Sequence, residues 1–466
     1  KRGQRSAHQP ATVRHAHLWG PRELFAGSGD AKHLVGGKYH WLAEHDISST
    51  EWTKVESQSP YYLFRPQDMI LSAEYEDSWS VTKMMSESSL GCLTKRDNLV
   101  IGQTEDDVRS RILRFIDANK TEQQAASEFG LELTDHDMWN VRTARASINP
   151  KDVGSFIRAE SFRPFDTRYI FYHEKFIARL NRRIMHHLDH ENLALVTVRQ
   201  LASLPFDHIW VTQSLSDQHL ISVRTKEGGV IFPLYLYPDP TKKNTLFDTD
   251  TPTTAPGGRR PNLSTAFIAD MSAKLNMQFI TDGRGDLQAT FGPEDVFDYL
   301  YAVFHSPTYR LRYAEFLKID FPRLPLTADA DLFRALCGLG KRLVALHVME
   351  ASSTINREAT ALPSYPAAGN NVVEKIEYRV TPDEPGRGRV CINGQQYFEG
   401  VPPDVWEFHV GGYQVCHKWL KDRKGRALSY EDINHYRRVV AALAETIMLM
   451  ERIDEVIDQC GGWPLV

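Results

Sequence analysis

Arginines and aromatic residues alternate in two short strand-like segments of the chain. FRPFDTRYIFY spans residues 162–172, and VRTKEGGVIFPLYLY spans residues 223–237. Arginine can hold a phosphate, or bind the O6 and N7 atoms of guanine through two hydrogen bonds. A rigid scaffold that presents arginines among aromatic side chains is suited to reading a polyanion. The two segments therefore predict a cationic face that binds nucleic acid.

A second basic cluster, KWLKDRKGR, spans residues 418–426 and has the composition of a helix end that grips phosphates. Its alternative is a solvated turn before the last helix. For each arginine of the chain, an internal ion pair is an equal alternative to a phosphate contact. Arg163 and Arg168 flank Asp166, which favours internal pairs for these two.

Glutamines in the same central region could read adenine, because a side-chain amide matches the N6 and N7 atoms of that base. Gln200, Gln213 and Gln218 have this potential. The predicted DNA-contacting set combines cations from the centre and the second cluster with two of these glutamines. Its members are Arg163, Arg168, Arg179, Arg182, Arg183, Arg199, Gln200, Gln218, Arg224, Lys226, Lys418, Lys421, Arg423, Lys424 and Arg426.

The segment LFAGSG, residues 24–29, looks like the glycine-rich turn that holds S-adenosylmethionine in DNA methyltransferases. Such a turn needs a buried strand before it and a helix after it, whereas WGPRE precedes it and Gly36-Gly37 soon follows. An amine methyltransferase also needs an Asn/Asp/Ser-Pro-Pro-aromatic tetrapeptide, and Ser59-Pro60-Tyr61 has a single proline. The sequence therefore predicts a loop without cofactor at LFAGSG.

Other patterns that could support catalysis are incomplete. His186 and His190 are spaced as metal ligands on a helix, but no glutamate or cysteine completes a site, so the cluster with His187 is predicted to face solvent or DNA. GLGKR at 338–342 lies in an amphipathic segment and lacks the Ser or Thr of a phosphate loop. An isolated Asp30-Ala31-Lys32 does not make a nuclease centre. No catalytic, metal-binding or cofactor-binding residue is predicted in this chain.

The composition is that of a soluble, multi-domain protein. The chain has 466 residues, 42% hydrophobic and 25% charged, and a net charge of −5 that hides an Arg-rich stretch at 158–183 and an acidic tail at 445–458. Five scattered cysteines and the lack of a signal peptide or an apolar span predict a reduced, cytoplasmic protein. Lys1 in place of Met indicates a piece of a longer chain.

Periodicity predicts helices and strands in separate blocks, which is typical of an α+β fold. The predicted helices cover 105–116 behind a Thr104 cap, 122–129, 175–188, 264–275, 294–305, 309–317, 331–349 and 429–457. The predicted strands cover 193–198, 208–212, 219–224, 230–237, 372–380 and 388–398. A Thr/Pro/Gly/Asp-rich segment at 238–261 is predicted to be a loop or linker.

Several blocks, in this order, resemble the C-terminal part of type ISP restriction-modification enzymes, which combine nuclease, helicase, methyltransferase and target recognition in one polypeptide. They are FRPFDTRYIFY, NLALVTVRQ, FPLYLYPD, FHSPTYRLRYAEFLKIDFPRLPL and VWEFHVGGYQVCHKWLKDRKGR followed by LSYEDINHYRRVV. The earlier VRHAHLWG, KYHWLAEHDISSTEW and TKRDNLVIG resemble the stretch that joins the methyltransferase core to the recognition domain. LFAGSGDAKHLVGG interrupts those earlier blocks like an insertion.

The resemblance implies that this chain recognises one site on double-stranded DNA, while other domains methylate adenine at N6 and restrict invading phage DNA in a prokaryotic cytoplasm. S-adenosylmethionine, ATP and Mg²⁺ would serve the intact enzyme rather than this chain, whose helicase, nuclease and methyltransferase signatures are missing. The expected partners are DNA and the methyltransferase and helicase domains, not a membrane.

With this resemblance, the expected architecture has three parts. Residues 1–150 form a smaller α/β connecting region, residues 151–350 a target-recognition domain with a β-rich centre and helices, and residues 351–466 a β patch and long helix that complete it. Two alternatives remain open at this point. The chain could be an adenine methyltransferase subunit that uses FAGSG, or a scaffold whose helices from Asp331 and Ser429 dock another domain.

Overall fold

The computed structural model describes residues 11–57, 62, 64, 68–135, 138–202, 205–222, 227–239, 255–350, 362–381 and 386–465. The chain divides into two compact units, Lys1–Glu74 and Tyr75–Val466, and each is described by itself. The boundaries predicted near residues 150 and 350 do not coincide with this division. Among the described residues, none of the helices combines the length and the apolar character that a membrane span requires.

The first unit contains two antiparallel ribbons and a short helix. β1 (Val13–His15) pairs with β4 (Thr53–Val55), β2 (Leu24–Ala26) pairs with β3 (His33–Gly36), and α1 (Lys38–Glu44) follows β3. The glycines of LFAGSG therefore turn the chain back into a second strand. A Cβ atom at Gly27, whose φ is 83°, would lie 2.3 Å from the carbonyl oxygen of Ala31. The segment is a hairpin and not a strand-to-helix cofactor turn, so its residues do not fit S-adenosylmethionine.

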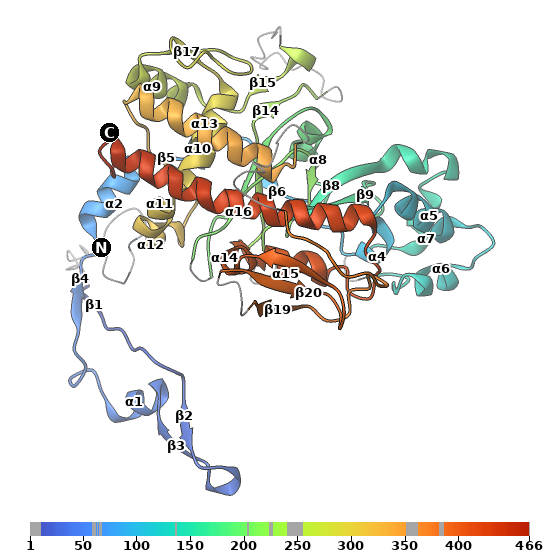
Figure 1. The fold of residues 1–466 in the computed structure, drawn as a ribbon, viewed down its shortest axis with the longest axis horizontal. Coiled ribbons are helices and arrows are strands. Elements are labelled where there is room, and N and C mark those ends of the chain that lie inside the picture. Colours follow the sequence, from blue (N-terminus) through green and yellow to red (C-terminus); the bar gives the residue numbers. More distant parts are fainter. Residues whose placement is uncertain are drawn as a thin grey trace, which may run out of the picture. The chain divides into compact units, whose positions relative to one another are not determined.

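Two four-stranded sheets form the β-rich centre of the second unit (Figure 1). The first has the strand order β11-β10-β13-β6 and the second the order β12-β8-β9-β7. All neighbours are antiparallel except β12 and β8. The strands are β6 (Ser89–Leu90), β7 (Ile101–Gly102), β8 (Ile157–Arg163), β9 (Asp166–Phe171), β10 (Ala194–Thr197), β11 (Ile209–Thr212), β12 (Leu215–Ser216) and β13 (Val230–Pro233). Because β7 pairs with β9, the second sheet crosses the boundary predicted near residue 150.

Two predicted elements of this centre are wrong. The strand expected at 219–224 is absent from its described part, since Asp217 accepts the backbone N–H of His219 at 2.7 Å and folds the chain into a turn. The helix expected at 175–188 shrinks to α8 (Arg182–Met185) and a 3₁₀ turn (His186–Asp189). Asn181, with a left-handed φ of 49°, separates them from an extended stretch that pairs with the segment near residue 93.

Helices from the segment that precedes β8 pack on one side of β8 and β9. α5 (Glu105–Ile116), α6 (Glu122–Glu128) and α7 (Val141–Ala146) follow α4 (Asp97–Val100), and α5 packs on both strands. The Thr104 hydroxyl caps α5, as predicted, by accepting the N–H of Asp107 at 3.1 Å. Val108, Ile112 and Phe115 form the buried face of α5.

The longer helices that the sequence predicts are confirmed in the second unit. Gly340 shows why GLGKR is a packing motif, because a Cβ there would lie 1.8 Å from the Asp298 carbonyl oxygen on the neighbouring helix. The helices are α9 (Thr265–Leu275), α10 (Pro293–His305), α11 (Pro307–Arg312), α12 (Ala314–Leu317), α13 (Ala330–His347) and α16 (Tyr430–Gln459). α16 packs against α10, α11, α13, α14 and α15 (Figure 1).

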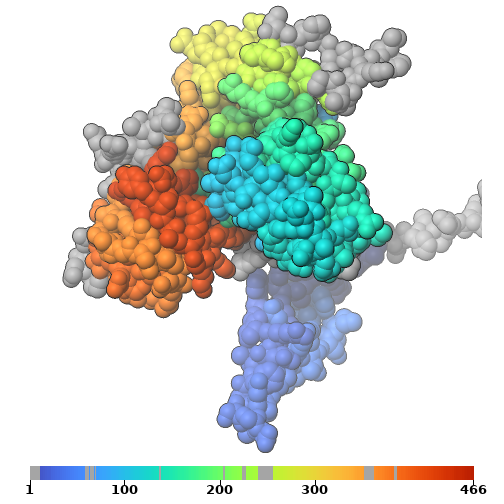
Figure 2. All heavy atoms as spheres, turned by 90° about the vertical axis from the view of Figure 1, so that its right-hand side faces the viewer, coloured from blue at the N-terminus to red at the C-terminus, as the bar shows by residue number. Residues whose placement is uncertain are grey.

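A three-stranded antiparallel sheet with short helices lies beneath α16 and confirms the second predicted β patch. Its elements are β19 (Glu377–Val380), β20 (Gly388–Cys391), β21 (Tyr397–Val401), α14 (Pro403–Trp406) and α15 (Val415–Lys421), with a β22 (His409–Val410) and β23 (Tyr413–Gln414) hairpin between the helices. Figure 2 shows this region beside the α5–α7 and β8–β9 region on one face.

The remaining elements are small and complete the α+β fold. Three further strand pairs link distant segments: β5 (Trp79–Ser80) with β18 (Arg323–Leu324), β14 (Tyr235–Leu236) with β15 (Arg260–Pro261), and β16 (Gln278–Phe279) with β17 (Thr290–Phe291). Two helices, α2 (Met69–Glu76) and α3 (Val81–Met84), flank β5. Most of the loop predicted at 238–261 lies outside the described residues.

Candidate nucleic-acid interface

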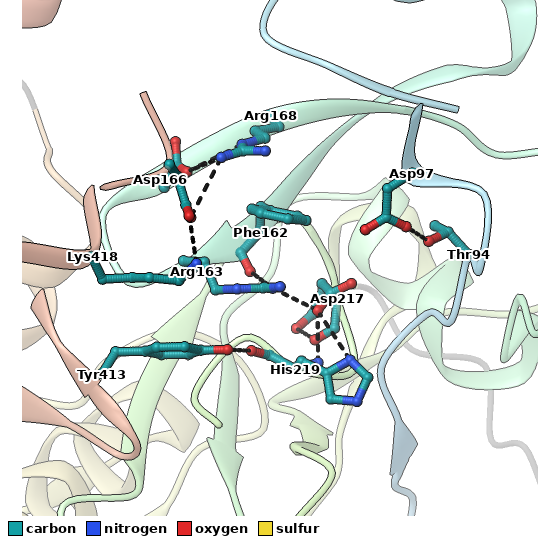
Figure 3. Close-up of polar contacts among 12 residues, drawn as sticks. Thr94, Asp97, Phe162, Arg163, Asp166, Arg168, Asp217, His219, Tyr413 and Lys418 are labelled. Carbon is teal, nitrogen blue, oxygen red and sulfur yellow. Dashed lines mark hydrogen bonds and ion pairs between the residues drawn. The ribbon is translucent and has the colours of Figure 1, made fainter. Parts of the chain in front are cut away.

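The arginine at the end of β8 is an internal residue. Arg163 Nη1 lies 2.7 Å from Asp217 Oδ1, and both side chains are nearly buried (Figure 3). The guanidinium also lies over the Phe162 ring, 3.9 Å from its centroid. The pair therefore fixes β8 to the turn after β12. The internal alternative holds for Arg163, although its partner is Asp217 and not the neighbouring Asp166.

Asp166 is the centre of a second buried ion cluster. Its Oδ1 accepts from Arg423 Nη2 at 2.8 Å and its Oδ2 from Arg168 Nη2 at 2.9 Å. The side chain of Arg423 is 5% exposed and stacks on Trp419, 3.5 Å from the ring centroid. Burial alone would raise the pKa of Asp166, but the two arginines outweigh burial and hold that pKa below its ordinary value. This cluster joins the β8–β9 hairpin to the end of α15.

The predicted DNA contacts of Arg163, Arg168 and Arg423 therefore conflict with the internal pairs that these side chains form. Breaking a buried ion pair leaves an uncompensated charge. These three guanidinium groups therefore stabilise the fold, and each would have to leave its carboxylate to bind a ligand. Arg168 is also partly covered and has a second carboxylate, Asp422 Oδ2, at 3.6 Å. The three residues explain how distant segments of the chain come together.

Two cations of the 418–426 cluster are paired with carboxylates, one at the end of α15 and one at the start of α16. Lys418 Nζ lies 2.5 Å from Asp422 Oδ1, and Arg426 Nη2 lies 3.0 Å from Asp432 Oδ2. Burial lowers the pKa of Lys418, and its pair with Asp422 opposes that shift. Because Lys418 is 24% and Arg426 40% exposed, both remain within reach of solvent.

Two further predicted contacts are surface ion pairs. Arg183 pairs with Glu87, and Arg199 Nε lies 3.2 Å from Asp320 Oδ1. The arginine side chains are 59% and 67% exposed, respectively. An exposed pair of this kind contributes little to stability, so either arginine can exchange its carboxylate for a phosphate.

Four predicted cations are exposed and form no side-chain hydrogen bond or ion pair within the part of the chain that the structure describes. They are Arg179 and Arg182, which flank Asn181, and Lys421 and Lys424 at the end of α15. An unpaired surface cation breaks no ion pair of the fold when it binds a phosphate, although its side chain must become ordered. These four are the strongest phosphate-contacting candidates, and no neighbour in the fold explains their charge.

The predicted glutamines differ in access. Gln200 is exposed, whereas Gln218 is half-buried and its Oε1 is buried without a hydrogen bond among the described residues. Arg224 and Lys226 lie outside the described residues, so their predicted contacts stay predictions.

Glu160 is a buried carboxyl that the sequence reasoning missed. It is fully buried on β8, and neither carboxyl oxygen has a hydrogen-bond partner in the described part of the chain. Burial, followed by the charges of Asp217 and Asp97, raises its pKa well above the ordinary value. Glu160 lies two residues before the buried Phe162, on the same face of the strand, and this spacing is the signal that could have indicated its burial.

Part of the prediction for the histidine cluster is wrong. No group of three or more His, Cys, Asp or Glu residues within the described ranges could hold a metal ion. His187 is buried rather than solvent-facing, and its Nδ1 accepts the N–H of Tyr237 at 3.0 Å. Burial lowers the pKa of His187 to about 3. His190 is exposed and stacks on Tyr237.

The described residues of the second unit define an α+β fold with internal arginine clusters and separate surface cations. A family model described as the type ISP C-terminal specificity domain matches residues 83–452. The chain belongs to this family.

Solved structures with the same fold include a cryo-EM structure of a DrdV–DNA complex, with a TM-score of 0.62 and 17% identity over 89% of this chain. A nuclease-deletion mutant of the type ISP restriction-modification enzyme LlaGI, in complex with a DNA substrate mimic, has a TM-score of 0.55 and 17% identity over 89% of the chain. The ATP-dependent type ISP enzyme LlaBIII bound to DNA has a TM-score of 0.58 and 16% identity, again over 89%. The chain spans 41%, 31% and 26% of the respective proteins. No curated protein was found to match the chain.

Proposed function

We propose that this chain is the module that recognises a specific sequence on double-stranded DNA in a type ISP restriction-modification enzyme. The observation that carries the proposal is the specificity-domain family match over residues 83–452. The surface chemistry supports it, because Arg179, Arg182, Lys421 and Lys424 present charge that the fold does not use. Base readout by this module would direct N6-adenine methylation and restriction by other domains.

We place the chemistry of the enzyme outside this chain. S-adenosylmethionine, ATP and Mg²⁺ would be bound by methyltransferase, helicase and nuclease domains, in the cytoplasm where DNA is accessible. A domain that extrudes a base for methylation gains specificity when a separate module grips the neighbouring base pairs. The role of the present residues is then to bind and orient the duplex, with phosphate contacts setting the register and base contacts setting the sequence.

Selection from a randomised duplex pool tests the proposal. The chain is incubated with the pool at two salt concentrations, and the bound DNA is sequenced. We expect an enriched motif and an affinity that falls steeply with salt, because each neutralised phosphate releases counterions. Salt-dependent binding without enrichment would contradict specific readout by this chain, and salt-insensitive or absent binding would favour the scaffold alternative.

A further inference from the structure

A polar cleft opens at the point where the chain passes from one four-stranded sheet to the other. β11 is the edge strand of the first sheet, β12 is the edge strand of the second, and Gln213 and Ser214 join them. The cleft beside this link has a volume of about 240 Å³, and its wall includes Ser161 of β8 and Trp210 of β11.

Three hydroxyl side chains hold this link in place. Ser161 Oγ lies 2.8 Å from Thr212 Oγ1 and 3.0 Å from Ser214 Oγ. The N–H of Ser214 donates to Thr212 Oγ1 at 3.2 Å, and the Thr212 hydroxyl donates to the Ser214 carbonyl at 3.0 Å. Both neighbours of Gln213 are therefore anchored to β8. Anchoring lowers the ordering cost that a flexible loop would incur on binding.

Gln213 itself is exposed, and its amide has no hydrogen-bond partner within the residues that the structure describes. The buried Gln396 behaves differently. The amide of Gln396 donates to Ala367 and Asn371, and its carbonyl accepts from Asn371 and Asn393. Gln396 is thus committed to the fold, whereas the donor and acceptor of Gln213 are both available to a ligand.

The cleft is electrically neutral, which favours a base edge over a phosphate. Its two ionised side chains, Arg163 and Asp166, are held by the internal pairs with Asp217 and Arg423. Burial lowers the pKa of His347, which also lines the cleft, to about 3, so its ring is uncharged at neutral pH. A ligand of this cleft must therefore be recognised by hydrogen bonds to neutral groups.

We propose that Gln213 is a specificity-determining residue that reads one A·T base pair from the major groove. A glutamine amide forms two hydrogen bonds with the N6 and N7 atoms of adenine, and the other bases do not offer that donor–acceptor pair in the major groove. This inference rests on the proposed function. It adds one position to the DNA-reading surface and names the base that the position selects.

The test repeats the randomised-duplex selection with Gln213→Ala and Gln213→Glu in the complete chain. We expect the wild-type motif to lose its preference at one A·T position, with that preference falling about 5- to 150-fold, while other positions keep theirs. Gln213→Glu, which accepts but does not donate, should move the preference at that position toward cytosine. Thermal unfolding of both variants checks that the fold is intact.

Gln395→Ala is the matched control, because Gln395 is an exposed glutamine between β20 and β21 of the three-stranded sheet. It should leave the whole motif unchanged. A wild-type motif that survives Gln213→Ala overturns the inference and leaves the proposed function standing. A uniform loss of affinity over all positions also overturns it, because base readout cannot act in that way. A wild-type chain without any motif overturns both.

Discussion

The junction between the β8–β9 hairpin and α15, and the surface loops beside it, use the same residue types for opposite purposes. At the junction, Arg163, Arg168 and Arg423 are buried or partly covered and paired with carboxylates. On the surface, Lys421 and Lys424 stand within three residues of Arg423 and are exposed. Under the proposed function, the exposed cations are the ones expected to contact DNA phosphates.

This contrast shows that charge density along a sequence does not locate a binding face. KWLKDRKGR supplies a structural clamp and free cations in the same nine-letter run, because successive residues at a helix end point in different directions. The number of nearby carboxylates decides the outcome for each cation. Substitutions that affect one region and spare the other test this difference between the junction and the surface.

The largest expected effect is that of Arg423→Ala. It leaves Asp166 with one fewer charge partner in a buried site, which should lower the free energy of unfolding by about 3–5 kcal/mol. Denaturant unfolding measures this loss. Lys424→Ala, at the exposed neighbour, should change stability by less than about 0.5 kcal/mol. Equal effects of the two substitutions would contradict the division between clamp and surface.

Glu160→Gln should change how stability depends on pH. Because the pKa of Glu160 is raised in the folded chain, the folded state keeps a proton that the unfolded state releases above the ordinary value of 4.5. The free energy of unfolding should therefore fall as pH rises from 4.5 toward the raised pKa, and Glu160→Gln should flatten that fall. Urea unfolding of both proteins between about pH 5 and pH 8 measures the slope. Parallel slopes would mean that Glu160 does not hold the proton.

Alanine at Arg179, Arg182, Lys421 or Lys424 should weaken binding to all DNA sequences by a similar factor. Each lost phosphate contact should reduce the salt dependence of log K by about 1. Titration of a fixed duplex at several salt concentrations measures this slope, and thermal unfolding should show no change. Lys151→Ala, at an exposed lysine outside the predicted DNA-contacting set, is the control. A variant that changes base preference instead would contradict a phosphate role.

The smallest expected effect belongs to Arg199→Ala. Its ion pair with Asp320 is exposed, so stability should fall by about 0–1 kcal/mol. If Arg199 exchanges its carboxylate for a phosphate, the same substitution should weaken DNA binding more than it weakens the fold. A double-mutant cycle with Asp320→Ala separates the two effects. A larger loss of stability than of binding would place Arg199 with the junction residues.

Much of the fold followed from local patterns in the sequence. The Thr104 and Ser429 caps, the Pro293 helix start and the apolar runs of β10 and β13 are signals carried by a few adjacent residues. Errors arose where a side chain overrode the local preference. Asp217 folded the expected strand at 219–222 into a turn, and left-handed Asn181 shortened the expected helix.

The candidate site was less predictable, because its decisive contacts join residues far apart in the sequence. Asp166, which lies between Arg163 and Arg168, correctly indicated the internal pair of Arg168, but neither the Arg163–Asp217 pair nor the Asp166–Arg423 pair could be read from adjacent letters. The sequence next to Glu160 contains no charge pattern that would have predicted its burial. Exposure of Gln213 depends on a crossing between two sheets, which only the assembled fold reveals.

The Asp166–Arg423 pair also constrains the order in which this protein can fold during its synthesis. The two residues are separated by 257 positions. At a synthesis rate of about 5–20 residues per second, the hairpin would wait roughly 13–50 s on the ribosome before its partner is made. During that interval Asp166 can pair with Arg168 but not with Arg423, and the hairpin cannot close against α15. A nascent chain that stops before residue 423 therefore lacks the contact that joins the β8–β9 hairpin to the end of α15.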